Sequence, residues 1–348
     1  MDRLDLGRLI PDQSFYNRYI PRVYQTEHGD MTDVEILEIA IKKGKNTLLM
    51  GPTGPGKTSL YYAVCAKNQY PLGTANLNGQ STVEDLVGQI IPTTSNPMRL
   101  AALIETVVEA RDRALRLQMK AVPDATAGDY FEAKKDVSRA ELNLDAYTKM
   151  EGDLVWVDGL LVRLMRGDPR FEHTVFLADE VNFAPAKVMA ILNGVTDDRR
   201  QVTVVQHEGE VITAHPGFHF GAAMNPSYEG TRNLNKAFRD RFHVQLYFDY
   251  DPKVEGRLIP HERLLQVVRE LREMMKTDQI VTPVSTRMML HYLSNKEDFG
   301  LEIARLCFTA HFEEEEQLAV NAVAELKLGG GRGHSQTPKF GDLPDSAV

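Results

Sequence analysis

One glycine-rich run of eight residues, GPTGPGKT at 51–58, constrains this chain more than any other feature. It fits the pattern G-x-x-x-x-G-K-[ST] and lies between an apolar stretch, 46–50, and a stretch of helical character, 58–67. In a strand, tight loop and helix of this kind, backbone N–H groups and the positive end of the helix dipole converge on one point. The run therefore predicts a loop that binds the phosphates of a nucleotide.

The side chains of this loop predict separate roles. We expect Lys57 to neutralise charge on the β- and γ-phosphates and Thr58 to place its hydroxyl on Mg²⁺. A glycine-rich turn without a ligand is the alternative, and the flanking strand and helix argue against it. The predicted nucleotide-binding residues of the loop are Gly51, Pro52, Thr53, Gly54, Pro55, Gly56, Lys57, Thr58 and Ser59.

A pair of acidic residues, Asp179 and Glu180, follows the apolar run 175–178. We expect Asp179 to hold Mg²⁺ through its water shell and Glu180 to act as the general base on the attacking water. A strand-end acidic pair is by itself usually a solvated loop or a helix cap, so this interpretation depends on the phosphate loop. Asn225 ends another apolar run and is a candidate to orient the same water, although, taken alone, an ordinary turn before Pro226 explains it better.

The periodicity of apolar residues predicts an α/β fold in which a parallel sheet is flanked by helices. Predicted strands alternate with helical or polar stretches through the first 250 residues. From about residue 251 the strand signal stops and the pattern becomes helical, which predicts a smaller, all-helical domain. The predicted strands are 46–50, 74–78, 174–178 and 218–224, and the predicted helices are 32–43, 58–67, 81–86, 262–277, 285–294, 301–312 and 314–326.

A long interruption separates the second predicted strand from the third. Two charge-rich helical stretches, 100–120 and 130–150, are joined by turn-forming residues and predict a helical hairpin. Strand-like stretches at 88–94 and 153–157 flank this hairpin, so we expect it to project from a small β-hairpin, and another β-hairpin is predicted at 201–213. The predicted domains are an N-terminal extension (1–30), a nucleotide-binding domain (31–250) with an insert at about 88–157, a helical lid domain (251–328) and a disordered tail (329–348).

Composition excludes several classes of protein. The formal net charge of −9 and the absence of a basic stripe argue against a nucleic-acid partner. The two cysteines, Cys65 and Cys307, lack the spacing of a zinc site and are expected to be buried, and the ten histidines show no metal-ligand spacing. No window approaches the roughly 18 apolar residues of a membrane span, and no apolar signal segment starts the chain, so a cytoplasmic protein is expected.

With these elements in order, the chain resembles the MoxR-like branch of AAA+ ATPases, which belongs to the helix-2-insert clade. The resemblance covers about residues 33–287. It depends on LADEVN at 177–182 followed by Ala184-Pro185, on RQVTV at 200–204, on MNP at 224–226 and on YEGT at 228–231. Two further stretches, WVDGLL at 156–161 and LNKAFRDRF at 234–242, look closest to the CbbQ and NorQ type activases.

The resemblance implies an AAA+ core and a helical lid that bind ATP and Mg²⁺, in a homo-oligomer that forms a hexameric ring. It implies that Asn225 is the sensor-1 residue, that Arg241 is the arginine finger with Arg239 as the alternative, and that Arg287 is the sensor-2 residue. The insert would then carry a β-hairpin that faces the pore of the ring. Two departures stand out: the helical piece at 98–150 is much longer than usual, and Phe183 stands where the family commonly has arginine.

For function, the resemblance implies an ATP hydrolase that acts like a chaperone on a client protein. It would remodel or activate the client, for example by inserting a cofactor or metal, often together with a von Willebrand A-type partner. A nucleic-acid-associated AAA+ motor is the alternative, and the acidic composition argues against it. A nucleotide-switched scaffold that does not hydrolyse ATP is a third interpretation, and the presence of Glu180, Asn225 and Arg241 argues against that one.

Overall fold

The structure is a computed structural model, and it describes residues 5–27, 29–93, 97–118, 126–148, 153–226 and 234–328. The chain divides into two compact units, one formed by residues up to 52 and from 56 to 249, the other by 53–55 and residues from 250 onward. The predicted tail at 329–348 and the YEGT stretch at 228–231 lie outside the described residues.

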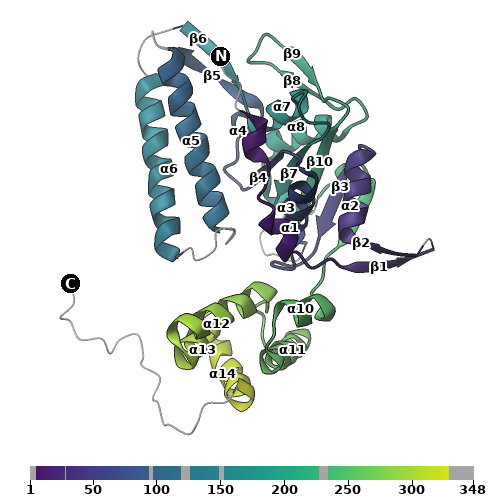
Figure 1. The fold of residues 1–348 in the computed structure, drawn as a ribbon, viewed down its shortest axis with the longest axis vertical. Coiled ribbons are helices and arrows are strands. Elements are labelled where there is room, and N and C mark those ends of the chain that lie inside the picture. Colours follow the sequence, from purple (N-terminus) through teal and green to yellow (C-terminus); the bar gives the residue numbers. More distant parts are fainter. Residues whose placement is uncertain are drawn as a thin grey trace, which may run out of the picture. The chain divides into compact units, whose positions relative to one another are not determined.

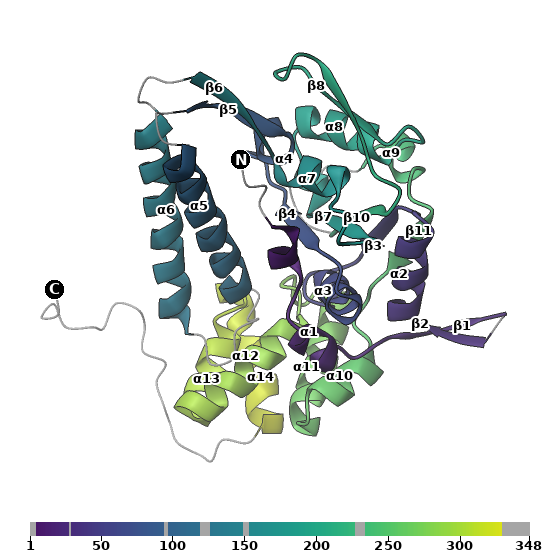
Figure 2. The same cartoon turned by 45° about the horizontal axis from the view of Figure 1, so that its top comes forward.

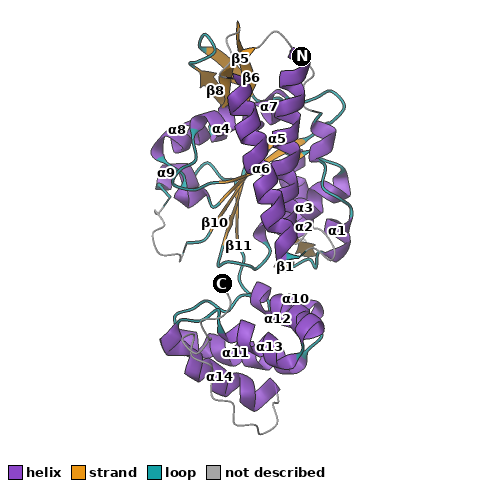
Figure 3. Cartoon of the chain, turned by 90° about the vertical axis from the view of Figure 1, so that its left-hand side faces the viewer, coloured by secondary structure: helices purple, strands orange, loops and turns teal. Residues whose placement is uncertain are grey.

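Among the described residues of the first unit, five strands form one parallel sheet in the order β11-β3-β10-β7-β4 (Figures 1 and 2; strands are orange in Figure 3). At its centre, Met224 at the end of β10 pairs in register with Met50 at the end of β3. The carboxyl ends of these strands therefore meet at one edge of the sheet. The strands are β3 (Thr47–Met50), β4 (Leu72–Asn76), β7 (Thr174–Asp179), β10 (Phe218–Met224) and β11 (Val244–Tyr247).

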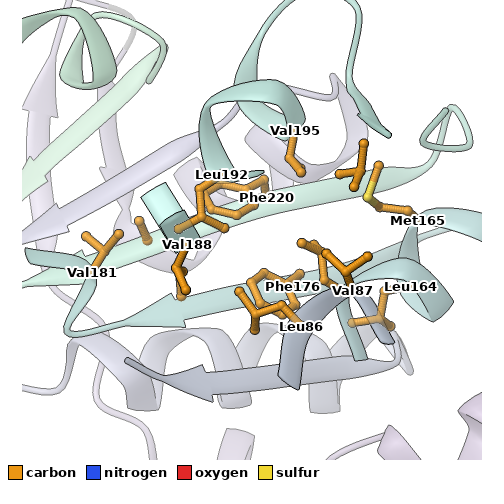
Figure 4. Close-up of a cluster of buried hydrophobic side chains, with 14 of the residues drawn as sticks. Leu86, Val87, Leu164, Met165, Phe176, Val181, Val188, Leu192, Val195 and Phe220 are labelled. Atoms are coloured by element: carbon orange, nitrogen blue, oxygen red, sulfur yellow. The ribbon is translucent and has the colours of Figure 1, made fainter. Parts of the chain in front are cut away.

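Helices cover both faces of this sheet, because successive side chains of a strand point to opposite faces. In β7, Val175 and Leu177 pack with the helices of one face, α2 (Asp33–Lys42) and α3 (Lys57–Asn68). Phe176 packs on the other face, where Figure 4 shows it beside Leu86 and near Val188. That face is covered by α4 (Val83–Val87), α7 (Leu160–Arg166) and α8 (Ala186–Thr196).

Local chemistry fixes where the first helices begin. Thr32 caps α2, since its hydroxyl accepts from the backbone N–H of Glu35 at 3.2 Å while the Glu35 carboxylate accepts from the N–H of Thr32 at 2.7 Å. α3 begins at Lys57, directly after Gly56, whose φ of +99° is in the left-handed region. The phosphate loop is therefore held between a buried strand and a helix that starts at its last glycine.

The insert of the first unit consists of a β-hairpin and a helical hairpin. β5 (Gly88–Thr93) pairs antiparallel with β6 (Asp153–Asp158), and α5 (Pro97–Gln118) runs beside α6 (Ala127–Thr148) (Figure 2). Ion pairs tie the two helices together, between Arg111 and Glu141 at 2.7 Å and between Arg113 and Asp136 at 3.5 Å. A second antiparallel hairpin is formed by β8 (Gln201–Val204) and β9 (Glu210–Thr213).

The second unit is helical in its described part and has its own apolar core. Buried Glu255 links three of its helices, because it lies on the first, forms an ion pair with Arg272 of the second at 2.7 Å and accepts a hydrogen bond from Thr286 of the third at 2.5 Å. The helices are α10 (Pro252–Leu258), α11 (Glu262–Lys276), α12 (Thr286–Phe299), α13 (Leu301–Thr309) and α14 (Glu314–Leu328).

Several elements differ from the sequence prediction. The short edge strand β11 and the helix α10 were not predicted, and β4 begins at Leu72, two residues before the predicted strand. The N-terminal stretch contains a hairpin of β1 (Val23–Thr26) and β2 (Gly29–Thr32), after η1 (Leu6–Leu9) and α1 (Ser14–Arg18). Cys65 is buried as expected, whereas Cys307 is only half-buried. No helix in the described part of the chain is both long and apolar enough to cross a membrane.

Candidate nucleotide-binding site

The phosphate loop follows β3 and depends on glycines at three positions. Gly51, Gly54 and Gly56 have φ angles of +144°, +87° and +99°, which residues with a side chain rarely adopt. A Cβ atom at Gly51 would also lie 1.8 Å from the carbonyl oxygen of Phe248. The N–H of Gly51 donates to the carbonyl of Met224 at 3.2 Å, so the loop begins against the end of β10.

Lys57 is the first residue of α3, and its side chain folds back on the loop. Its ammonium group donates to the carbonyl oxygens of Gly51 at 2.8 Å and Pro52 at 2.5 Å, and the residue is buried. The loop thus keeps a cation beside the N-terminus of α3, where backbone N–H groups also point outward. This arrangement suits a polyphosphate. Ser59 is the third residue of α3 and is exposed.

The hydroxyl of Thr58 donates to the carboxylate of Asp179 at 2.6 Å. Thr58 lies in the first turn of α3 and Asp179 ends β7, so two residues far apart in the sequence meet at the edge of the sheet. Hydroxyl and carboxylate oxygens are the protein ligands that Mg²⁺ takes when substrate phosphates and water supply the rest. No group of three or more His, Cys, Asp or Glu that could hold a metal occurs among the described residues. The Thr58 hydroxyl and the Asp179 carboxylate fit a Mg²⁺ whose other ligands are phosphate oxygens and water.

Glu180 directly follows the strand and is exposed. Its φ of +54° is in the left-handed region, which is unfavourable for a residue with a side chain, and its N–H donates to the Asp179 carboxylate at 3.0 Å. The chain therefore turns sharply between the two acidic residues, and the two carboxyl groups are not equivalent. Asp179 faces the loop, while Glu180 is accessible to water.

Asn225 follows β10 and is half-buried. Its backbone carbonyl accepts from the side-chain amide of Asn182 at 3.1 Å, and Asn182 is buried in η2 (Val181–Phe183). The segment after Glu180 is thereby tied to the segment after β10. Asn182 occurs in the LADEVN stretch, but nothing in the sequence assigned it a role.

The two candidate arginine fingers lie at the end of α9 (Lys236–Arg239) and just after it. Arg241 is half-buried, and its guanidinium donates to the carbonyl of Ala237 at 2.5 Å. Arg239 is exposed, and its guanidinium nitrogen lies 3.7 Å from the sulfur of Met50. Exposure favours Arg239 as a residue that can reach another chain, whereas the resemblance favours Arg241.

Arg287 belongs to the second unit, in the first turn of α12. Ser285 caps this helix, because its hydroxyl accepts from the N–H of Met288 at 3.3 Å. The cap fixes where the helix begins and hence the place of Arg287 on it. Its predicted role as a sensor remains a prediction.

Sequence reasoning missed a buried polar cluster from the N-terminal stretch. Asp33 is fully buried, accepts from the hydroxyl of Tyr19 at 2.5 Å and lies 3.7 Å from the guanidinium of Arg22. Burial raises the pKa of Asp33. A Cβ atom added at Gly56 would lie 4.0 Å from both Arg22 and Tyr19, so this cluster borders the phosphate loop. An Asp at the start of a helix is usually explained by the helix dipole, so Asp33 carries no distinctive signal in the sequence.

A second buried network lies between β3, α3 and β10. The hydroxyls of Thr47 and Tyr61 share a hydrogen bond, and Thr47 is also 3.1 Å from Nε2 of His219. Burial lowers the pKa of His219 to about 3, so the imidazole is neutral near neutral pH. Gly221 leaves room for this network, since a Cβ atom there would lie 2.0 Å from the Tyr61 hydroxyl.

Residues 118–242 match the AAA domain of the dynein-related subfamily. This AAA segment contains Asp179, Glu180, Asn225 and Arg241, and the phosphate loop precedes it. Together with the five-stranded parallel sheet, the match shows an AAA+ P-loop NTPase fold, followed by a helical region of α11 to α14. AAA domains are in general nucleotide-binding ATPase domains.

Relatives of known sequence are similar over most of the chain. An uncharacterized protein of Staphylococcus aureus (strain USA300) is 28% identical over 262 residues, which are 74% of this chain and 76% of that protein. A second uncharacterized protein, from Staphylococcus aureus (strain bovine RF122 / ET3-1), is 27% identical over 262 residues, which are 74% of this chain and 76% of that protein. Their names assign no activity.

Solved structures with an overall similarity include a candidate ATPase from Cytophaga hutchinsonii, with a TM-score of 0.39 and 16% identity over 92% of this chain and 91% of that one. The P216G mutant of RuvB from Thermotoga maritima has a TM-score of 0.31 and 15% identity, over 83% of this chain and 66% of that one. Both scores are low. The fold assignment depends instead on the sheet topology and the AAA match.

Proposed function

We propose that this protein is a Mg²⁺-dependent ATP hydrolase of the MoxR-like type, which works as a homo-oligomeric ring and remodels or activates a client protein. The observation that carries the proposal is the 2.6 Å hydrogen bond between Thr58 and Asp179. It joins the phosphate loop to the acidic end of β7, as a nucleotide-bound magnesium requires. The loop glycines, Lys57 and the AAA match support the same interpretation.

In this proposal each residue at the edge of the sheet has one task. The N–H groups around Gly56 and the ammonium of Lys57 bind phosphate oxygens, and Thr58 and Asp179 hold Mg²⁺. The bound Mg²⁺ supplies positive charge that balances the charge developing on the phosphates. Glu180 accepts the proton of the attacking water, and Asn225 orients that water. The left-handed turn at Glu180 separates the base from the carboxylate that holds the metal.

Hydrolysis would be completed by a neighbouring subunit. We assign Arg241 as the arginine finger, with Arg239 as the alternative, and Arg287 as the residue that reports nucleotide state to the helical unit. An arginine that reaches the γ-phosphate from another chain makes turnover depend on assembly. Four parts of the proposal rest on the resemblance alone. They are the hexamer, a client that receives a cofactor or metal, a von Willebrand A-type partner, and a position in the family close to the CbbQ and NorQ type activases.

The test is ATP binding and turnover by the purified protein. Lys57→Ala and Asp179→Ala should each abolish measurable ATP binding by calorimetry, whereas Glu180→Gln should still bind ATP and turn it over at least about 100-fold more slowly. Lys45→Ala and Asp198→Ala, which change exposed residues away from the loop, serve as matched controls and should behave as wild type. Unchanged ATP binding after both Lys57→Ala and Asp179→Ala would refute the proposal.

The Glu180→Gln protein also separates the two functional classes. Because it should hold ATP without hydrolysing it, it should keep its target bound during a pull-down. A protein target whose addition stimulates the wild-type turnover supports the client-remodelling function. Stimulation by DNA alone would instead favour the nucleic-acid-associated motor.

A further inference from the structure

One face of α6 carries large apolar side chains together with cations. Phe131 and Leu142 are 65% and 69% exposed, values that are high for side chains of this size. They stand at the two ends of a shallow hollow of about 410 Å³. We name this surface the α6 outer face; it is lined by Phe131, Lys134, Lys135, Ser138, Arg139 and Leu142.

Helix geometry places these residues on one side of α6. Phe131 and Leu142 are eleven residues apart, which is about three turns and roughly 16 Å along a helix. The opposite side of α6 carries Ala133 and Ala140, which are buried. Figures 1 and 2 show α5 between α6 and the rest of its unit. The α6 outer face is therefore turned away from the described part of its own unit.

The charges of α6 are divided between its two sides. Asp136 and Glu141 form ion pairs with arginines of α5, so these acidic groups are neutralised at the contact between the helices. On the outer face, Lys134, Lys135 and Arg139 are exposed, and none of them has an ion pair with a described carboxylate. Exposed Glu132 lies at the edge of this face, and exposed Asp145 lies one turn beyond Leu142. The face thus presents three cations between two apolar ends.

We propose that the α6 outer face binds an acidic amphipathic helix of the client protein, an inference that rests on the proposed client-remodelling function. Apolar side chains of that helix would cover Phe131 and Leu142, while its carboxylates would meet the three cations between them. Large apolar side chains contribute little to binding phosphate groups but are typical anchors of protein interfaces. A protein segment is therefore the favoured occupant.

The experiment uses the full-length protein and three synthetic amphipathic peptides of about 20 residues. They share leucines at helical spacing and differ only in the charged positions, which are all Glu, all Gln or all Lys. Binding is measured by fluorescence anisotropy. The wild-type protein should bind the Glu peptide at least about tenfold more tightly than the Gln peptide and should not bind the Lys peptide.

Variants of α6 decide whether this face is the site. The triple variant Lys134→Glu, Lys135→Glu, Arg139→Glu should no longer bind the Glu peptide and should bind the Lys peptide instead. The double variant Phe131→Ser, Leu142→Ser should bind the Glu peptide about tenfold more weakly than the wild type does. The matched control is Lys42→Glu, Lys43→Glu, Lys45→Glu, which reverses three exposed cations elsewhere and should keep the wild-type preference.

Two outcomes would overturn the inference. One is equal binding of the Glu peptide by the wild type and the triple α6 variant. The other is tighter binding of a short DNA duplex than of the Glu peptide, with loss of DNA binding in the triple variant. ATP turnover is measured on the wild type and on every variant. A wild-type protein that does not hydrolyse ATP would refute the proposed function. Normal ATP turnover combined with the wrong peptide preference would refute only this inference.

Discussion

At the scale of single residues, the fold buries polar groups in places where ionisation is costly. His219 is the clearest example, since it is fully buried beside Thr47 and burial lowers its pKa to about 3. In the unfolded chain a histidine has a pKa near 6.5. As pH falls from about 6.5 to about 3, the unfolded state gains a proton that the folded state does not bind. The free energy of unfolding should therefore fall across this range.

The prediction compares wild type with His219→Gln, which lacks the titrating group. Urea unfolding followed by circular dichroism between about pH 4 and 7 should show a smaller loss of unfolding free energy in the variant as pH falls. His243→Gln is the control, because His243 is exposed. Parallel curves for wild type and His219→Gln would show that this histidine does not set the pH dependence.

Gly51 gives a second prediction at this scale. Gly51→Ala would place a methyl group against the Phe248 carbonyl at a position where φ is +144°, so we expect a loss of about 1–3 kcal/mol of stability together with loss of ATP binding. Gly79→Ala is the matched control, since a Cβ atom there meets no heavy atom within 4 Å. Thermal unfolding and calorimetric ATP titration of both variants measure the effect. Tight ATP binding by Gly51→Ala would contradict the geometry of the loop.

How far these residues could be predicted depends on whether their chemistry is local in sequence. The loop 51–58 is contiguous, so its pattern alone indicates phosphate binding. The pairing of Thr58 with Asp179 crosses much of the chain, and it could be expected only because strand ends of a parallel sheet meet at one edge. The cluster around Asp33 was missed because no residue of it has a distinctive local pattern.

At the scale of elements, a polar cluster joins the insert to the β8–β9 hairpin. Arg166 at the end of α7 forms ion pairs with Asp158 of β6 at 2.9 Å and with Glu210 of β9 at 2.7 Å. Trp156 of β6 stacks on His207 with ring centroids 5.4 Å apart. Arg166 also lowers the pKa of Glu210 to about 2. Two hairpins that are distant in sequence are thus joined by the ion pairs of Arg166 and by the stacking of Trp156 on His207.

Arg166→Ala should loosen the β8–β9 hairpin. These partners are partly exposed, so the ion pairs contribute up to about 1 kcal/mol, and amide hydrogen exchange in 201–213 should become about fivefold faster. Arg170→Ala is the control, because Arg170 forms similar exposed ion pairs with Asp5 and Asp168 elsewhere. Exchange that is unchanged in Arg166→Ala would mean that the arginine does not hold the hairpins together.

Elements with a strong local signal were predicted closely, whereas the short edge strand β11 was not predicted. α3 and β10 lie within a residue of their predicted bounds, because α3 follows directly on the glycine loop and β10 is a continuous run of buried residues. β11 has only four residues and lies at the edge of the sheet, where two of them are exposed. So short an element leaves little periodic signal, and its place in the sheet is decided by pairing with β3.

At the scale of the whole molecule, the insert and the catalytic edge are separate parts of one unit. α5 and α6 leave the sheet domain through β5 and β6, and none of the residues assigned to ATP chemistry lies in 99–147. Replacing 99–147 with a short linker should therefore preserve basal ATP turnover but abolish client remodelling. Turnover is measured with and without the client captured by Glu180→Gln. A truncated protein that still remodels the client would show that the helical hairpin is not the client-binding part.

The assembly makes the sharpest prediction, because the general base and the arginine finger are assigned to different subunits of one site. Arg241→Ala and Glu180→Gln should each lower turnover at least about 100-fold when pure. In an equal random mixture, a site regains both groups when an Arg241→Ala subunit lies beside a Glu180→Gln subunit in the right order. That arrangement occurs at about one quarter of sites, so roughly a quarter of wild-type turnover should return.

Mixing Arg239→Ala with Glu180→Gln in the same way distinguishes the two candidate arginine fingers. Glu180→Gln subunits can restore the turnover only of the variant that lacks the true arginine finger. Arg239 is the more exposed of the two, and Arg241 is held to the Ala237 carbonyl, so the outcome also tests whether that contact opens in the ring. If neither arginine variant is complemented by Glu180→Gln, hydrolysis is completed within a single chain, and the ring is not required for the chemistry.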